Sequence, residues 1–253
     1  MSESLVVESV TVDYGGVRAL DNVTMSVKKP IHALIGPNGA GKTTLLNVIS
    51  RFQRPSTGAV LFSGEDVTKA APHYMADLGI ARTFQHPPLI DDLTVTENIE
   101  FGCNPSAKVG FIDALLPTPR RFRVARERRR RAREVIGFLD LKVWADTLAR
   151  DTPPPVRKLV DLARALAGRP KFVLLDEPTS SLDDAQIETV SRRLTELRTT
   201  MQILLISHHL DLVMDLADTV SVLNFGRKIA EGTPADVAKD EQVIEAYTGL
   251  KTE

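Results

Sequence analysis

Cysteine is almost absent from this chain of 253 residues, in which Cys103 is the only one. A disulfide framework within the chain is therefore excluded, and the composition fits a reducing compartment. Long apolar runs are absent as well, since no window approaches the ~18–20 residues that a membrane-spanning helix needs. The opening MSESLVVESV has no basic region followed by an apolar run, so no signal peptide is expected. If the protein works at a membrane, we expect a partner to hold it there.

An excess of charge of either sign is also lacking. The chain has 32 Lys and Arg against 33 Asp and Glu, which gives a net charge of −1 and points to no particular class of partner. Hydrophobic residues make up 43% and charged residues 26%, as is ordinary for a folded globular protein. The length fits one large α/β domain, or one domain with a subdomain insert.

The hydrophobic pattern predicts a mostly parallel sheet with an antiparallel sheet at the start. Apolar residues alternate in the two segments 4–14 and 19–27, which is typical of antiparallel strands with one covered face. Short apolar runs at 31–36, 171–178 and 201–209 predict buried parallel strands. Helical patterns separate them, and the tail predicts two short strands followed by a capped helix. Strands that alternate with helices indicate a doubly wound α/β architecture.

A glycine-rich loop follows the first of these buried strands. The segment GPNGAGKT, Gly36 to Thr43, has the spacing G-x-x-x-x-G-K-[ST] and opens a helix. Glycines let successive backbone N–H groups point at a phosphate, and the helix N-terminus adds a favourable dipole. We expect Lys42 to reach the β- and γ-phosphates and the Thr43 hydroxyl to ligate Mg²⁺.

The buried run FVLLDEP predicts the partner of this loop. Asp176 stands at the carboxyl end of the predicted strand, where ligands bind in such sheets, and is expected to hold Mg²⁺ through water. Glu177 is then placed to polarise an attacking water as general base. An isolated Asp-Glu pair would more often be a solvated strand end, but here the phosphate loop lies upstream.

Together, the phosphate loop, the FQ segment, the DEP strand and the strand ending in histidine resemble the nucleotide-binding subunit of an ABC transporter over nearly the whole chain. The resemblance implies an α/β P-loop NTPase of the ABC type. It would have a RecA-like core, an N-terminal antiparallel β subdomain and a helical subdomain insert at about residues 86–167 of a single domain spanning 1–253. It also implies that Tyr14 stacks on adenine, that Gln85 senses Mg²⁺ and the attacking water, and that His208 contacts the γ-phosphate. Residues 180–183, SSLD, match the loop that contacts the opposing subunit, and His209 is interpreted as a surface histidine.

The resemblance assigns two sets of site residues. The catalytic set is Glu177, His208, Gln85 and Lys42, and the metal set is Thr43, Gln85 and Asp176. The residues expected to bind ATP are Tyr14, Gly36, Pro37, Asn38, Gly39, Ala40, Gly41, Lys42, Thr43 and Thr44.

Three segments look most like the branched-chain amino-acid uptake group within the family: GIARTFQ, LTVTENI and the ending IAEGTPADV…VIEAYTG. This implies an ATP-hydrolysing subunit that energises import of a small solute at the cytoplasmic face of the inner (plasma) membrane, as a peripheral protein. The implied partners are two transmembrane permease subunits, a second and different ABC ATPase subunit with an intact signature, and an extracytoplasmic solute-binding protein. Two alternatives stay open: a soluble ABC ATPase acting on nucleic acid or ribosomes, and a regulatory ABC subunit that does not hydrolyse ATP.

The segment that aligns with the family's LSGGQ-like signature reads TPPPV, Thr152 to Val156. The family signature reaches the γ-phosphate bound by the opposing subunit with a serine hydroxyl and unpaired N–H groups, whereas proline has neither. The helix itself should form, because Thr152 can cap it and proline is tolerated in the first turn. We therefore expect a degenerate signature. The alternative is an ordinary helix start in a protein without any signature.

An arginine run, PRRFRVARERRRRAR, lies in a segment, 111–145, that is expected to be helical. The arginines are expected to spread around most of the helix, which favours a solvated face. Contact with anionic lipid headgroups is an alternative. Nucleic acid is a third alternative that the run supports less well, because only Phe122 interrupts the run with an aromatic ring.

Overall fold

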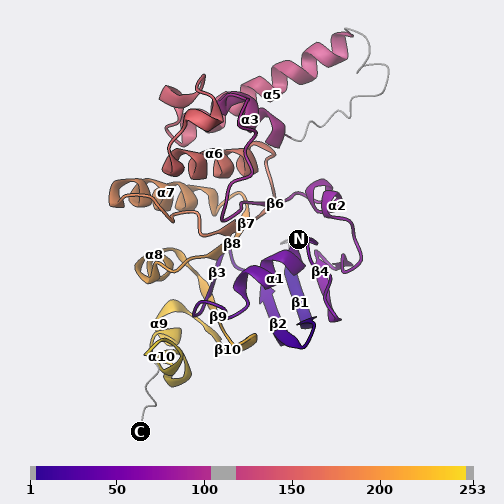
Figure 1. Cartoon of the computed structure of the whole chain (residues 1–253), viewed down its shortest axis with the longest axis vertical. Helices are drawn as coiled ribbons and strands as arrows, with labels where there is room; N and C mark the ends of the chain where they lie inside the picture. Colours follow the sequence, from indigo (N-terminus) through magenta and orange to yellow (C-terminus); the bar gives the residue numbers. More distant parts are fainter. Residues whose placement is uncertain (1–3, 104–117, 249–253) are drawn as a thin grey trace. The chain divides into compact units, whose positions relative to one another are not determined.

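The computed structural model describes residues 4–103 and 118–248 of the chain (Figure 1). The chain divides into two compact units. The first consists of Met1–Arg82, Lys171–Glu177 and Leu194–Glu253, and the second of Thr83–Pro170 and Pro178–Arg193. No helix within 4–103 and 118–248 is long and apolar enough to cross a membrane.

The first unit contains an antiparallel sheet in which the strand order is β2-β1-β4-β5. Its strands are β1 (Leu5–Tyr14), β2 (Val17–Val27), β4 (Thr57–Phe62) and β5 (Glu65–Asp66). The expected antiparallel pairing of β1 with β2 is confirmed. The buried positions of β1 change phase from Leu5 and Val7 to Val10 and Val12. A register shift between Val7 and Val10 explains the change, because the extra residue of a bulge moves the following side chains to the other face.

A six-stranded sheet forms the rest of the strand framework of this unit, with the order β10-β9-β3-β8-β7-β6. Its strands are β3 (Ile31–Ile35), β6 (Ile80–Arg82), β7 (Phe172–Asp176), β8 (Gln202–Ile206), β9 (Thr219–Asn224) and β10 (Arg227–Gly232). All neighbours are parallel except β10 and β9. Every residue of β3 and β7 is buried, as their continuous apolar runs predict.

Helices bury both faces of this sheet. The helices of the first unit are α1 (Lys42–Ile49), α2 (Pro72–Asp77), α8 (Leu210–Leu216), α9 (Pro234–Val237) and α10 (Glu241–Thr248). Leu34 shares one core with Leu46 of α1 and with the antiparallel sheet. Its neighbours Ala33 and Ile35 belong to a second core with Val213 of α8 and residues of α9 and α10. Alternate side chains of β3 therefore pack into different cores on the two faces of the sheet. The prediction of a doubly wound architecture is confirmed.

The second unit is built on three helices that contact one another (Figure 1). They are α3 (Val95–Gly102), α5 (Pro119–Phe138) and α6 (Pro154–Ala167), with short 3₁₀ turns at Lys142–Trp144 and Ala149–Asp151. The helix α7 (Asp184–Leu197) begins in this unit and ends in the first. A Cβ on Gly102 would lie 1.9 Å from the carbonyl oxygen of Arg164, so only glycine permits the close approach of α3 and α6. The first seven residues of the predicted helical segment 111–145 lie outside the described residues.

Candidate functional site

The phosphate loop joins β3 to α1 as predicted. Gly36 has φ 147°, and a Cβ there would lie 2.0 Å from the carbonyl oxygen of Leu223, so no other residue fits. Gly41 is the N-cap of α1, and no side chain caps it. The first N–H groups of a helix have no partner within the helix, and the helix dipole makes this end positive. The loop therefore presents backbone donors suited to an anion.

Lys42 lies in the concavity of this loop. Its Nζ donates hydrogen bonds to the carbonyl oxygens of Gly36 and Pro37, at 2.7 and 2.9 Å. Burial lowers the pKa of Lys42, and the charges of Glu177 and Asp176 act in the opposite direction. The structure thus brings the lysine of the loop within electrostatic reach of both predicted acidic residues.

The other residues of the loop differ in exposure. Asn38, Gly39 and Thr43 are exposed, Thr44 is half-buried and Ala40 is buried. The carbonyl of Ala40 accepts a hydrogen bond of 3.0 Å from the backbone of the β9–β10 turn. This bond ties the loop to a hairpin from the other end of the chain.

Asp176 ends β7 and forms a buried ion pair that the sequence did not reveal. Arg82 Nη2 lies 3.3 Å from Asp176 Oδ2, and the two side chains are only 7% and 3% exposed. Arg82 Nη1 also donates to Asn47 and Ser50 of the α1 region, at 2.7 Å each. Burial lowers the pKa of Arg82. Arg82 thus fixes the carboxylate of Asp176 against the helix that follows the phosphate loop.

Glu177, the next residue, has a left-handed backbone with φ 51°. This conformation costs roughly 1–2 kcal/mol in a residue with a Cβ. Its N–H donates to the carbonyl of Ile206 at the end of β8, at 3.0 Å, which holds the turn in place. An observed strained residue of this kind is typical of functional sites.

His208 lies beside Glu177. Its Nδ1 is 3.5 Å from Glu177 Oε1. The ring of His209 stacks on the His208 ring with 4.4 Å between centroids, and His209 is half-buried. His209 therefore packs against His208 and is partly exposed, in keeping with the surface histidine that we expected.

Two tyrosines of the first unit differ in their surroundings. Tyr14 is exposed at the end of β1, where it pairs with Val17 across the turn. Burial raises the pKa of Tyr247 in α10, whose hydroxyl is hydrogen-bonded to the backbone of Gly36. Tyr247 lies far from Gly36 in the sequence, and no motif predicts the contact.

In the second unit, α6 holds the segment that contains Gln85. Gln85 itself is exposed, and its carbonyl accepts a hydrogen bond from Lys158. The N–H of Phe84 donates to Asp161 Oδ2 at 2.8 Å, and burial raises the pKa of this aspartate. Arg164 donates to Asp161 at 2.6 Å and to the carbonyl of Pro88 at 2.7 Å. The FQ segment therefore rests on about two turns of α6, from Lys158 to Arg164.

The start of α6 differs from the prediction in one respect. The N-cap is Pro153, with no side-chain cap, and the N–H of Arg157 donates a hydrogen bond to the carbonyl of Pro153 at 3.1 Å. Thr152, which we expected to cap the helix, instead donates its hydroxyl to the carbonyl of Ala149 at 2.7 Å. A preceding 3₁₀ turn ends in this bond and keeps Thr152 buried. Val156 is consequently the only residue of Pro153–Val156 with an N–H group.

The SSLD segment at 180–183 leads into α7. The N–H of Asp183 donates to Gln186 Oε1 at 3.1 Å, and the N–H of Gln186 donates to Asp183 Oδ1 at 2.8 Å. This reciprocal cap fixes the helix start, so the loop ends in a defined position.

Comparison with known proteins identifies the family. The family model described as ABC transporter matches residues 20–180, and that described as branched-chain amino acid ATP-binding cassette transporter matches residues 227–249. The chain is 32% identical to the high-affinity branched-chain amino acid transport ATP-binding protein BraF of Pseudomonas aeruginosa, over 97% of both chains. It is 33% identical to LivG of Escherichia coli K12, the protein of the same description, over 98% of this chain and 99% of LivG.

Solved structures agree with these matches. A nucleotide-free ATP-binding cassette of an ABC transporter superposes with a TM-score of 0.83 at 32% identity, covering 98% of this chain and 100% of that chain. The ADP conformation of such a cassette gives a TM-score of 0.81 at 31% identity, covering 99% and 100%. The phosphate loop, the acidic end of β7 and the histidine end of β8 thus occur in the fold that these matches predict. The chain belongs to the ABC transporter family of ATP-binding subunits, in the group whose named members serve branched-chain amino acids.

Proposed function

We propose that this chain is the ATP-hydrolysing half of an asymmetric ATPase heterodimer that energises import of a small solute. The observation that carries the proposal is a contrast between two sites. The first unit has Lys42, Asp176, Glu177 and His208 grouped at the phosphate loop. The helix start that aligns with the signature has three prolines at and after its N-cap. In this proposal the two units are the core and the helical subdomain of a single ABC ATPase domain.

ATP binds at the phosphate loop in this account. The uncapped first turn of α1 and the Lys42 ammonium contact the phosphates, and Tyr14 stacks on adenine. Glu177 polarises the attacking water as general base, and His208 contacts the γ-phosphate beside it. Gln85 takes the role that its motif implies, on a segment held by α6.

The residues present fit a Mg²⁺ ion that arrives with the nucleotide. Mg²⁺ prefers oxygen ligands and usually keeps several waters when phosphates complete its shell. The Thr43 hydroxyl and the Asp176 carboxylate are such donors, and Arg82 fixes the orientation of the carboxylate. Within 4–103 and 118–248 there is no group of three or more His, Cys, Asp or Glu residues that could hold a metal by itself. The bound ion supplies positive charge against the phosphates.

In this proposal, the nucleotide site that TPPPV completes on the opposing subunit does not hydrolyse ATP. An ABC signature contributes a helix N-terminus to the ATP held by the opposing subunit, as the family resemblance implies. In α6, proline removes the N–H donor at the N-cap and the next two positions, and no hydroxyl replaces that of serine. The partner's ATP therefore meets a poor anion site, whereas this chain's own ATP meets the intact signature of a different ATPase subunit.

The partners follow from the names of the relatives. The relatives BraF and LivG are high-affinity branched-chain amino acid transport proteins. By analogy, the chain serves two transmembrane permease subunits and an extracytoplasmic solute-binding protein, as a peripheral protein at the cytoplasmic face of the inner (plasma) membrane. The solute is a branched-chain amino acid or a related small molecule.

A tagged copy of the chain, purified from membranes of its source cells, tests the proposal. We expect permease subunits and a second ATPase subunit to co-purify, and the complex to hydrolyse ATP much faster than the chain alone. Robust turnover by the isolated chain would contradict the asymmetry, because a homodimer has no intact signature. Failure of any membrane protein to co-purify would contradict the importer assignment.

A further inference from the structure

Five of the nine arginines of α5 gather on one exposed side of the helix, whereas Arg120, Arg121, Arg128 and Arg131 lie on its other sides, as the expected spread implies. At about 100° per residue, six residues lie within a sector of about 120°. They are Phe122, Arg123, Arg126, Arg129, Arg130 and Arg133, called the α5 basic face below, and all six are exposed. Arg131 is instead buried and paired with Glu127 at 2.5 Å, on the side where Val124 and Ala132 pack.

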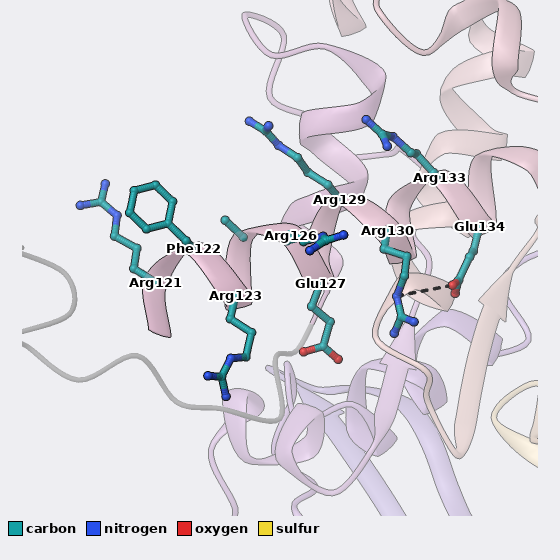
Figure 2. A pocket seen from close by; sticks show the side chains of 10 residues that line it. Arg121, Phe122, Arg123, Arg126, Glu127, Arg129, Arg130, Arg133 and Glu134 are labelled. Atoms are coloured by element: carbon teal, nitrogen blue, oxygen red, sulfur yellow. Dashed lines mark ion pairs between the residues drawn. The ribbon is translucent and has the colours of Figure 1, made fainter. Parts of the chain in front are cut away.

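Figure 2 shows this face from close by. Arg129 and Arg133 point to one side of the helix axis, Arg123 and Arg130 to the other, and Arg126 lies between them. The Phe122 ring, 65% exposed, stands beside Arg121 at the N-terminal end. The side chains fan out from one helix and line a common recess.

Few acidic groups neutralise the α5 basic face. The Nε atom of Arg129 lies 3.7 Å from Glu100 Oε1, and the Nε atom of Arg130 lies 3.8 Å from Glu134 Oε1. Both arginines are largely exposed. Such long surface pairs contribute little. Arg123, Arg126 and Arg133 have no ion-pair or hydrogen-bond partner in the described part of the chain. A local excess of positive charge therefore persists in a protein whose net charge is −1.

We propose that the α5 basic face binds the anionic phospholipid headgroups of the membrane. Guanidinium groups bind phosphate oxygens with paired hydrogen bonds, and clustered basic residues are attracted to anionic leaflets. An exposed aromatic ring beside the cations is typical of helices that lie at a membrane interface. The inference rests on the proposed function, which places the chain beside a membrane, and it adds a lipid contact made by the subunit itself.

Two observations favour a membrane over nucleic acid. Phe122 is the single aromatic residue that lines the recess, so the recess offers no row of rings on which bases could stack. The chain as a whole has a pI of about 6.5, whereas nucleic-acid-binding domains are usually strongly basic.

Sedimentation of the full chain with vesicles tests the proposal. We expect binding to vesicles of phosphatidylglycerol and phosphatidylcholine that weakens as salt is raised, and no binding to pure phosphatidylcholine. The triple variant Arg123→Gln, Arg126→Gln, Arg133→Gln should bind on the order of a hundredfold more weakly, at about fivefold for each arginine near the surface. Because these three side chains have no ion-pair or hydrogen-bond partner among residues 4–103 and 118–248, the variant should unfold at the wild-type temperature.

The matched control removes the same charge elsewhere. Arg54, Arg192 and Lys239 are exposed, and the variant with glutamine at all three should bind as the wild type does. Equal binding by the arginine triple variant and the wild type, or equal losses in both triple variants, would overturn the proposal. So would preferential binding of duplex DNA or RNA that vesicles fail to displace. The assay contains no ATP and no partner subunit, so a negative result here leaves the co-purification and turnover tests of the proposed function independent.

Discussion

At the scale of single residues, Arg82 links Asp176 to α1 through one guanidinium. Replacing it with methionine, Arg82→Met, leaves a buried carboxylate without its ion pair. Breaking a buried pair by removing one partner costs about 3–5 kcal/mol, so we expect a loss of that size in the free energy of unfolding. Urea unfolding followed by circular dichroism measures it. Arg82→Lys should lose less, and an unchanged stability in Arg82→Met would show that the pair does not hold the site.

His32 makes a second prediction at this scale, on pH. It is 1% exposed in β3, within 2.8 Å of Ser221 Oγ, and burial lowers its pKa to about 4. The unfolded chain binds a proton near pH 6.5. The free energy of unfolding therefore decreases as the pH falls below 6.5, and the decrease is complete below about pH 4. At about 1.4 kcal/mol for each pKa unit, the stability lost over this window is about 3 kcal/mol.

Urea unfolding between pH 7 and pH 4 measures this loss. Other groups also titrate there, so the test is the difference between the wild type and His32→Gln, which has no imidazole to protonate. The wild type should lose about 3 kcal/mol more than the variant. Parallel curves for the two proteins would contradict the buried neutral histidine.

Sequence alone reveals the site residues that lie within short motifs. Lys42, Asp176 and Glu177 follow strands that are visible as apolar runs, so their grouping follows from the way parallel strands end together. Arg82 and Tyr247 were missed because their roles depend on which distant segments pair. A strand of three residues places Arg82 beside Asp176, and such a strand has no periodicity to detect.

At the scale of elements, the start of α6 can be changed to restore a signature. The variant Pro153→Ser, Pro154→Gly, Pro155→Gly restores a hydroxyl and the N–H groups that proline lacks. Glycine in a helix costs about 1 kcal/mol relative to alanine, so some stability should be lost while the fold remains. In the complex with its partner, the restored signature should let the partner's site turn over ATP.

Combining this variant with Glu177→Gln isolates the effect. Because Glu177→Gln silences this chain's own site, any turnover that the restored signature adds belongs to the partner's site. ATP hydrolysis by the purified complex is the measurement. No gain over Glu177→Gln alone would show that TPPPV is not the reason for the asymmetry.

Elements were predictable where the pattern was long and regular. The continuous apolar runs identified β3 and β7. The gathering of five arginines on one side of α5 was missed, although the spacing of Arg126, Arg129, Arg130 and Arg133 contains it. Counting arginines along the run obscures the two residues, Arg128 and Arg131, that turn toward the packed side.

At the scale of the whole molecule, the proposed heterodimer pairs this chain with an ATPase subunit that has a different, intact signature. An ATPase pair with one intact and one degenerate site needs both subunits for turnover but uses one general base. The relatives fix the family and the fold over nearly the whole chain, whereas the asymmetry rests on the prolines at the start of α6 and on the geometry of Glu177.

ATP turnover of the purified membrane complex, wild type against Glu177→Gln, tests this central claim most directly. Removing a general base typically costs 10²–10⁴-fold in rate, so turnover should collapse by at least about a hundredfold. ATP binding by the variant should persist, because Lys42 and the phosphate loop are intact. Turnover that survives the substitution would place hydrolysis at the partner's phosphate loop, with TPPPV as a working signature, and would contradict the account.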